Sequence, residues 1–207
     1  PPDDIETMNR TLDEFEALKQ EGKIKLIGAS IKAADVTPHT LALCNQYIDS
    51  GRVDAIEVVY SILRQFHSKM FAHAYQKGVG IIARTSIESG FLSGKYKPGF
   101  SFTKTHKNDH RARWSEEKQN KIFSIVEELK NWAIKPPFQT LPQVAIKFSL
   151  APKEISSLIV GARNADQAKM NIESALLPDI ERNIIEKLIE EYSDTTVLAN
   201  IGKDIRN

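Results

Sequence analysis

Residues that could bind an anion follow a short apolar segment late in the sequence. Gly161, Arg163 and Asn164 come directly after residues 155–160. Asn164 is a favourable helix N-cap, and Gln167 stands three residues further on, which is the spacing of a capping box. Backbone N–H groups at a helix start and a guanidinium can together surround one phosphate. The same residues also fit an ordinary strand-to-helix turn with Arg163 in solvent, and both interpretations stay open.

Hydroxyl and basic side chains also follow other segments that read as strands. Ser30, Ser61 and the run from Arg84 to Ser86 stand at such ends. In parallel α/β proteins ligands meet the carboxyl ends of the strands. The pattern therefore predicts a polar rim suited to an elongated ligand that carries phosphate groups.

Strands alternate with helices along the chain. We expect strands at residues 23–30, 54–60, 79–84 and 155–160, and helices at 5–21, 37–50, 68–77, 115–133, 140–150, from 164 onward and at 179–192. This order predicts a parallel sheet with helices outside it. The strands are mostly continuous apolar runs, as expected when both faces of a sheet are buried. Four strands indicate half of a (β/α)8 barrel, which needs eight, or an open α/β sheet.

The segment 86–114 differs from the rest, because glycine, proline and basic residues gather in it. We expect a long loop with one helical turn near residues 90–96, and loops of this length in compact domains are often functional. The polar tail at about 194–207 is expected to be loosely held. We treat residues 1–207 as one domain.

Composition excludes several classes of protein. The 207 residues carry 28 basic and 27 acidic side chains, a net charge of +1. Such a chain has no global field for nucleic acid or an anionic membrane, and no apolar run approaches a membrane span. Cys44 is the only cysteine, which excludes an internal disulfide and fits a reducing, cytoplasmic location. The sequence starts at Pro1 without an initiator Met, and its first residues do not form a signal peptide, so we expect the chain to begin inside a longer polypeptide.

Single residues offer weaker hypotheses. The five histidines show no metal-ligand spacing, so no metal site is predicted. Tyr60 could serve as a catalytic phenol, but we expect its ring to pack in the core or at the rim. Cys44 lies on a predicted helix face beside Leu41 and Ile48, so we expect a buried thiol and not a nucleophile. A G-x-G-x-x-G dinucleotide fingerprint is missing.

Four motifs carry a resemblance to a known family. Residues 27–30 (IGAS), 58–63 (VVYSIL), 90–96 (GFLSGKY) and 159–171 (IVGARNADQAKMN) resemble, in order and spacing, segments of the aldo-keto reductases. The last two are the most specific, and the resemblance runs from about Asp3 to Leu177.

The resemblance implies a (β/α)8 TIM-barrel enzyme that moves a hydride between NADPH and a carbonyl substrate, with this chain covering about strands 5–8. Ser30 and Glu57 would contact the nicotinamide carboxamide, and Arg84 would lie against its ring. The pyrophosphate would be lined by Thr85, Ser86, Ile87, Glu88, Ser89 and Lys95, with the basic loop as a cover. The adenosine 2′-phosphate end would be held by Gly161, Arg163, Gln167 and Asn171. Arg163 favours NADP over NAD, because a dianion gains more from a bidentate donor.

The sequence also departs from the family pattern. Glu57 replaces the usual Gln, Ile31 an Asn, Arg84 an aromatic residue and Met170 an acidic one. The family's catalytic Asp, Tyr, Lys and His belong to its first four strands and have no counterpart here, so no catalytic residue is predicted in this chain.

Two functions remain open. The chain is either the cofactor half of an NADPH-dependent reductase, inactive by itself, or a truncated or degenerate relative that binds nucleotide or a protein partner without catalysis. The basic loop could be a nucleic-acid patch, but a cofactor cover explains it more simply. A half-barrel exposes its sheet edges, so we expect low stability or self-association through them.

Overall fold

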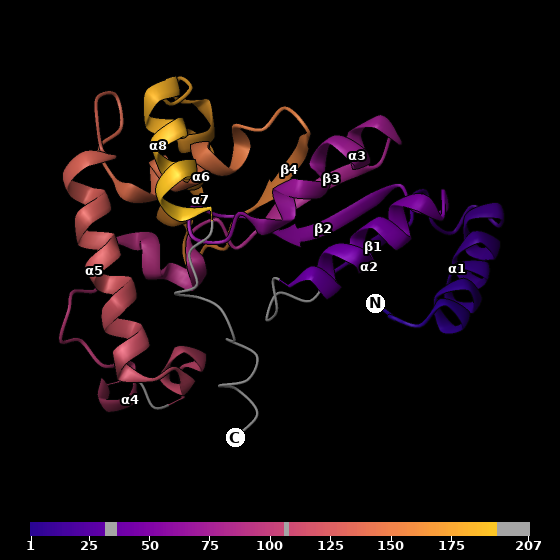
Figure 1. The fold of residues 1–207 in the computed structure, drawn as a ribbon, viewed down its shortest axis with the longest axis horizontal. Coiled ribbons are helices and arrows are strands. Elements are labelled where there is room, and N and C mark those ends of the chain that lie inside the picture. Colours follow the sequence, from indigo (N-terminus) through magenta and orange to yellow (C-terminus); the bar gives the residue numbers. More distant parts are fainter. Residues whose placement is uncertain (32–36, 106–107, 194–207) are drawn as a thin grey trace.

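A four-stranded parallel sheet lies at the centre of the computed structural model, which describes residues 1–31, 37–105 and 108–193. The strands β1 (Gly28–Ser30), β2 (Ala55–Val59), β3 (Gly80–Arg84) and β4 (Ile155–Ile159) pair in chain order (Figure 1). The predicted parallel α/β class is confirmed. The tail at 194–207 lies outside the described residues.

Helices occupy the connections, close to the predicted positions. The α-helices are α1 (Ile5–Gln20), α2 (Pro38–Asp49), α3 (Phe71–Gln76), α4 (Phe102–Thr105), α5 (Glu116–Trp132), α6 (Leu141–Leu150), α7 (Ala165–Leu176) and α8 (Arg182–Tyr192), with 3-10 helices η1 (Phe66–Met70), η2 (Glu88–Ser93) and η3 (His110–Arg113). In Figure 1, α1 stands at one end of the sheet, and α5 to α8 gather at the other.

The first strand is shorter than predicted. The backbone N–H groups of Lys23 and Ile24 both donate to the Leu18 carbonyl at the end of α1, so these residues still belong to the helix terminus. Leu26 is 68% exposed. The prediction of a buried strand from residue 23 is therefore wrong, and β1 begins at Gly28.

The two faces of the sheet are unlike each other. Ala29, Ile56 and Ile81 are buried on the face that α2 and α3 contact. Their neighbours in sequence point to the opposite face, where Ser30 is exposed and Glu57 and Ile82 are only half-buried. The expectation that both faces are buried is wrong for this structure, because no described element covers the second face completely.

The segment 86–114 is more ordered than a loop. The Phe91 ring stacks on Trp114 with centroids 4.8 Å apart, and Phe102 and Phe123 complete a buried aromatic cluster. Burial of these rings stabilises the short helices η2, α4 and η3. The 3-10 segment η2 overlaps the predicted helical turn near residues 90–96, but it runs from Glu88 to Ser93 and its backbone is non-helical at Ser89 and Gly90.

Two of the weaker chemical candidates belong to the core. Tyr60 is 3% exposed and packs between Phe71 and Phe148, and burial raises its pKa. Cys44 is fully buried, and this burial raises the pKa of its thiol to about 12. A thiol with this pKa is a poor nucleophile at neutral pH.

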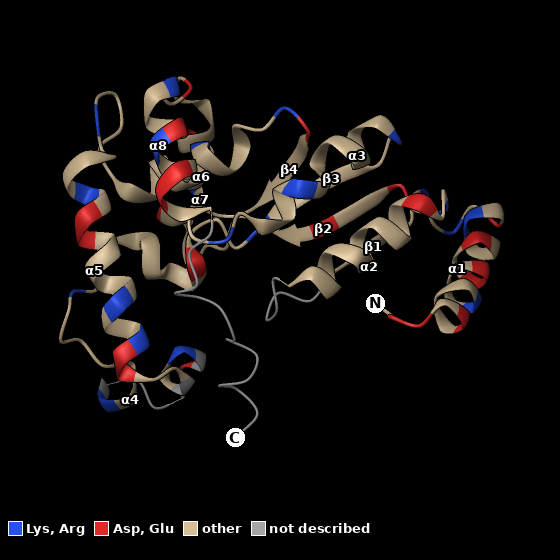
Figure 2. Ribbon diagram, in the orientation of Figure 1, with Lys and Arg blue, Asp and Glu red and all other residues tan. Residues whose placement is uncertain are grey.

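Surface charge is mixed. Figure 2 shows basic and acidic residues interspersed along α1 and α5. In the described part of the chain, no helix has both the length and the apolarity that a membrane crossing requires. Among these same residues, no three His, Cys, Asp or Glu side chains form a metal-binding group.

Candidate functional site

A cleft of about 550 Å³ opens where β3 and β4 end. This volume lies within the usual range of ligand pockets. One side, here called the β3 wall, comes from the segment 84–90, in which every residue except Glu88 lines the cleft, and the other, the β4 wall, comes from the segment 159–171. Because β3 and β4 are adjacent parallel strands, their carboxyl ends meet at the same edge of the sheet.

Strained backbone shapes the β3 wall. Thr85, Glu88 and Ser89 have φ values of 67°, 47° and 54°, in the left-handed region that non-glycine residues rarely adopt. Strain of this kind persists only where the surroundings enforce it, and it is common at ligand sites. Ser86 lines the cleft and is 1% exposed, and its hydroxyl has no hydrogen-bond partner among the described residues. A ligand oxygen in the cleft would satisfy that donor.

Glu88 belongs to the same segment but is turned away from the cleft. Its carboxylate is 1% exposed and forms an ion pair with Arg64, at 2.5 Å from Oε2 to Nη2 and 3.0 Å from Oε1 to Nε. The Ser61 hydroxyl donates a third hydrogen bond to it. Its acceptor positions are therefore used inside the protein.

Two cations reach the cleft from the segment 93–113. Lys95 is exposed at its rim. Arg111 is 2% exposed; its guanidinium donates to the Ser89 carbonyl at 3.0 Å and lies 4.0 Å from the Phe102 ring centroid. Burial lowers the pKa of Arg111, but the hydrogen bonds and charge of Asp109 together with the interactions of Tyr96 outweigh this and leave the pKa raised. Arg111 therefore stays charged in an apolar environment.

Local hydrogen bonds shape the β4 wall. The Asn164 side chain accepts from the Gln167 backbone N–H at 2.9 Å, and the Gln167 side chain accepts from the Arg163 N–H at 2.9 Å. Asn171 donates to the Gly161 carbonyl at 3.3 Å. The predicted N-cap at Asn164 is confirmed, although the Gln167 side chain accepts from the Arg163 N–H and not from the Asn164 N–H as in a capping box. The Arg163 side chain is exposed beside the start of the helix. The arrangement suits an anion.

An ion pair lies beside the cleft on the incompletely covered face of the sheet, the face of Ser30, Glu57 and Ile82, here called the open face. Arg84 Nε lies 2.7 Å from Glu57 Oε1, and Arg84 Nη2 donates to the Ile31 carbonyl at 2.6 Å. Burial lowers the pKa of Arg84, and the Glu57 carboxylate opposes this. Ser30 is the register partner of Glu57 on the neighbouring strand. Charged groups therefore line the open face up to the cleft.

The structure brings most of the residues predicted to bind cofactor into one cleft. These are Arg84, Thr85, Ser86, Ile87, Ser89, Lys95, Gly161, Arg163, Gln167 and Asn171. Three others lie elsewhere: Ser30 and Glu57 on the open face, and Glu88 behind the β3 wall. The cleft also includes Gly90, Ser93, Tyr96, Arg111, Pro142 and Met170, which were not predicted to bind. From the sequence, Arg111 was recognisable only as one of the basic residues of the segment 86–114.

These features define a parallel α/β protein with a polar, cation-lined cleft at the carboxyl ends of its strands. The profile described as "Aldo/keto reductase family" matches residues 1–190, and the chain belongs to that family. The resemblance carried by the four motifs is thereby confirmed.

The individual relatives share low sequence identity with this chain. The chain is 26% identical to the NADH-specific methylglyoxal reductase of Escherichia coli (strain K12), over 84% of this chain and 51% of that protein. Its fold is similar to that of aldo-keto reductase AKR11C1 from Bacillus halodurans in the holo form, with a TM-score of 0.64 and 23% identity over 87% of this chain and 56% of that one. The glycerol dehydrogenase AKR11B4 from Gluconobacter oxydans gives a TM-score of 0.67 and 16% identity, covering 89% of this chain and 54% of that one. The chain thus spans about half the length of the proteins it matches.

Proposed function

We propose that this chain is the dinucleotide-binding half of a nicotinamide-dependent oxidoreductase that reduces a carbonyl to an alcohol. The cleft between the β3 and β4 walls carries this proposal, because it combines an unpartnered buried hydroxyl, a capped helix start and basic side chains. These groups suit the phosphates of a dinucleotide. Membership of the aldo/keto reductase family makes a nicotinamide cofactor the most economical occupant.

Each wall then has a part in holding the ligand. Ser86 would donate a hydrogen bond to the pyrophosphate, and Lys95 would contribute positive charge at the rim. Arg163 and the first turn of α7 would hold the adenosine end, where a 2′-phosphate gives NADP an advantage over NAD. One of the relatives is an NADH-specific enzyme, so this preference needs a direct measurement.

The bound dinucleotide would supply a hydride to the carbonyl carbon. Glu57 and Arg84 would form the polar floor beside the reacting end, and their ion pair keeps Arg84 across the sheet. We propose that the group that protonates the carbonyl oxygen lies in a second half, outside this chain. The half-length match supports this, as does the open face of the sheet, which suits strands 5–8 of a barrel awaiting strands 1–4.

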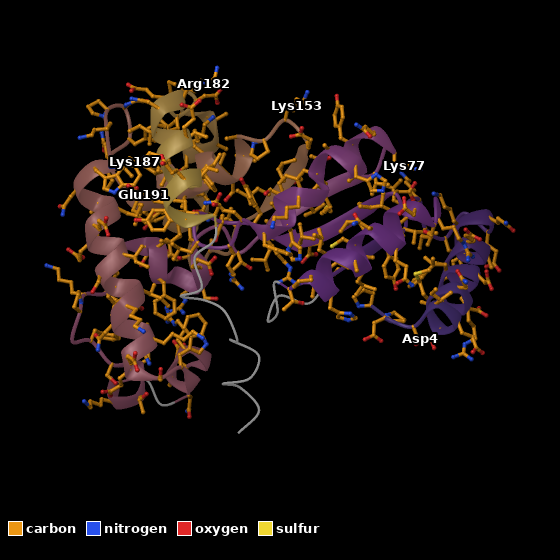
Figure 3. The ribbon with its side chains drawn as sticks, in the orientation of Figure 1. Asp4, Lys77, Lys153, Arg182, Lys187 and Glu191 are labelled. Atoms are coloured by element: carbon orange, nitrogen blue, oxygen red, sulfur yellow. The ribbon has the colours of Figure 1, made fainter. Side chains whose placement is uncertain are left out.

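Titration with NADPH and with NADH tests the proposal, with nicotinamide fluorescence as the signal. We expect the wild-type chain to bind NADPH more tightly, and Arg163→Ala to remove the preference. Arg182→Ala is the matched control: this arginine is exposed on α8 and pairs with Glu186 (Figure 3). If neither dinucleotide binds, the proposal is wrong.

The alternative is a non-catalytic member of the family that binds nucleotide or a partner subunit. The open face of the sheet and the exposed Leu26 beside β1 favour this second candidate. Mixing the chain with a separately produced N-terminal half of a related reductase discriminates the two. Carbonyl-dependent NADPH oxidation only in the mixture supports the first proposal; a complex without turnover supports the second.

A further inference from the structure

A buried ion pair lies behind the β3 wall, outside the cleft itself. Arg64 and Glu88 are 24 positions apart in sequence, and both are at least nine-tenths buried. Arg64 presents Nε and Nη2 to the two carboxylate oxygens, which is the bidentate geometry that fixes both partners in orientation. The pair joins the turn after β2 to the loop after β3.

Arg64 belongs to a rigid turn. Ser61 and Arg64 exchange backbone hydrogen bonds of 3.2 Å in each direction, and the Ser61 hydroxyl oxygen accepts from the Arg64 N–H at 3.1 Å. The next residue, Gln65, donates to the Leu188 carbonyl of α8 at 3.0 Å. The Arg64 backbone is therefore held by hydrogen bonds from Ser61 on one side and through Gln65 on the other, so that its guanidinium can serve as a fixed point.

Glu88 belongs to a segment that needs such a fixed point. Both Glu88 and Ser89 have left-handed φ values, and Thr85, at the start of the loop, has one too. An unrestrained loop would relax toward the commoner backbone regions. Arg111 supports the same loop from the cleft side through the Ser89 carbonyl. Ser86 belongs to the same loop, just before the two supported residues, and its unpartnered hydroxyl is part of the cleft lining.

We infer that Arg64 and Glu88 are positioning residues: their ion pair holds the loop 85–90 in the strained conformation that presents Ser86 and Ser89 to the cleft. Neither Arg64 nor Glu88 lines the cleft. Glu88, which the family resemblance placed at the pyrophosphate, thus acts through the loop backbone. The effect on the loop stands without any ligand, whereas the consequence for dinucleotide affinity rests on the proposed function.

Amide hydrogen exchange of the ligand-free chain tests the inference directly. In Glu88→Gln the side chain keeps its shape but loses its charge, and we expect exchange in residues 85–92 to accelerate by about tenfold or more while β2 and β3 stay protected. Arg52→Met is the matched control, because Arg52 forms an ion pair with Glu16 at 2.8 Å, remote from the cleft. Unchanged exchange in the loop of Glu88→Gln would overturn the inference.

A paired variant separates positioning from stability. Replacing both partners, Arg64→Met with Glu88→Met, leaves no uncompensated charge and should largely restore the melting temperature. In this double variant we still expect rapid amide exchange in the loop 85–90 and an NADPH dissociation constant about tenfold above that of the wild type. Recovery of loop protection together with stability would show that the pair is merely structural and would overturn the inference.

Ser61→Ala provides a milder perturbation should the charged variants fail to fold. It removes the hydroxyl that donates to Glu88 and that accepts from the Leu63 and Arg64 N–H groups, so we expect a smaller acceleration, in the loop 85–90 and in the turn 61–64; unchanged exchange in the loop would contradict the inference. If the wild-type chain binds no dinucleotide while the loop responds as expected, the proposed function fails and the positioning role stands.

Discussion

The two walls of the cleft are built in opposite ways. In the β3 wall Ser86 and Glu88 are buried, the backbone is strained, and the supporting contacts come from Arg64 and Arg111, distant in sequence. The β4 wall is exposed, and the side-chain hydrogen bonds within it join residues at most ten positions apart, from Gly161 to Asn171. One wall depends on the folded core, and the other depends on the start of a single helix.

This difference has consequences for ligand binding. A wall held by burial is ordered before a ligand arrives, so the ordering cost of binding is already met in folding. A wall held by local hydrogen bonds is more easily adjusted, and an exposed Arg163 can reorient toward its ligand. We therefore expect changes in the β3 wall to affect the fold and the site together, and changes in the β4 wall to affect mainly the site.

The largest expected effect comes from removing one arginine on each side. Arg64→Met leaves the Glu88 carboxylate buried without its cation, which should lower the free energy of unfolding by about 3–5 kcal/mol. Arg163→Met removes an exposed side chain and should change it by no more than about 0.5 kcal/mol. Urea denaturation of both variants measures the comparison, and equal losses would show that the walls are not different in kind.

Sequence reasoning predicted the β4 wall well, because its determinants are local. Asn164 and Gln167 sit at fixed offsets from the helix start, and residue type alone identifies them as capping groups. The order of strands and helices was accessible for the same reason, since periodicity and Gly or Pro punctuation act over short distances.

The β3 wall could not be predicted to this depth. The residues are adjacent in sequence, yet Ser86 faces the cleft and Glu88 turns to Arg64, and only the fold determines which does which. Left-handed φ at Thr85 and Ser89 runs against residue preference, so no local signal marks it. The shortening of β1 and the open face of the sheet likewise depend on what the rest of the molecule covers.

Acidification should destabilise the buried side of the sheet through His67, which is fully buried under β2 with Nδ1 3.3 Å from the Val59 carbonyl. Burial lowers the pKa of His67 from 6.5 to about 4. Above pH 6.5 the imidazole is neutral whether the chain is folded or unfolded. Between pH 6.5 and about pH 4 the imidazole of the unfolded chain takes up a proton, whereas the buried imidazole of the folded chain does not. The free energy of unfolding therefore decreases as the pH is lowered, by about 1.4 kcal/mol per unit of pKa difference and by about 3 kcal/mol in all.

Unfolding free energies of the wild type and of His67→Gln, measured from pH 7.5 to 4, check this prediction. The variant should lose the part of the slope that His67 contributes. His39→Gln, at an exposed histidine, should keep it. Identical slopes for the wild type and His67→Gln would contradict the prediction.

Removing the cap of the β4 wall should have a smaller effect. Asn164→Ala deletes the acceptor for the Gln167 N–H and should cost about 1 kcal/mol, as losses of helix N-caps usually do. The Arg163 N–H keeps its acceptor on Gln167, so the turn stays partly held. Circular dichroism and urea denaturation measure the loss. A loss as large as that of Arg64→Met would show that the β4 wall also depends on the core.

The smallest effect on stability, and the clearest on assembly, should come from Leu26→Ser. β1 is an edge strand with Leu26 exposed beside it, and unpaired edge groups favour pairing between copies of a chain. The substitution should change the free energy of unfolding by less than about 0.5 kcal/mol. It should also shift sedimentation toward monomer, because it removes apolar surface where a second copy would lie. Tyr75→Ser on α3, equally a large exposed side chain but remote from the edge, should leave association unchanged. Equal effects of the two would place the contact elsewhere, and a monomeric wild type would refute self-association through this edge.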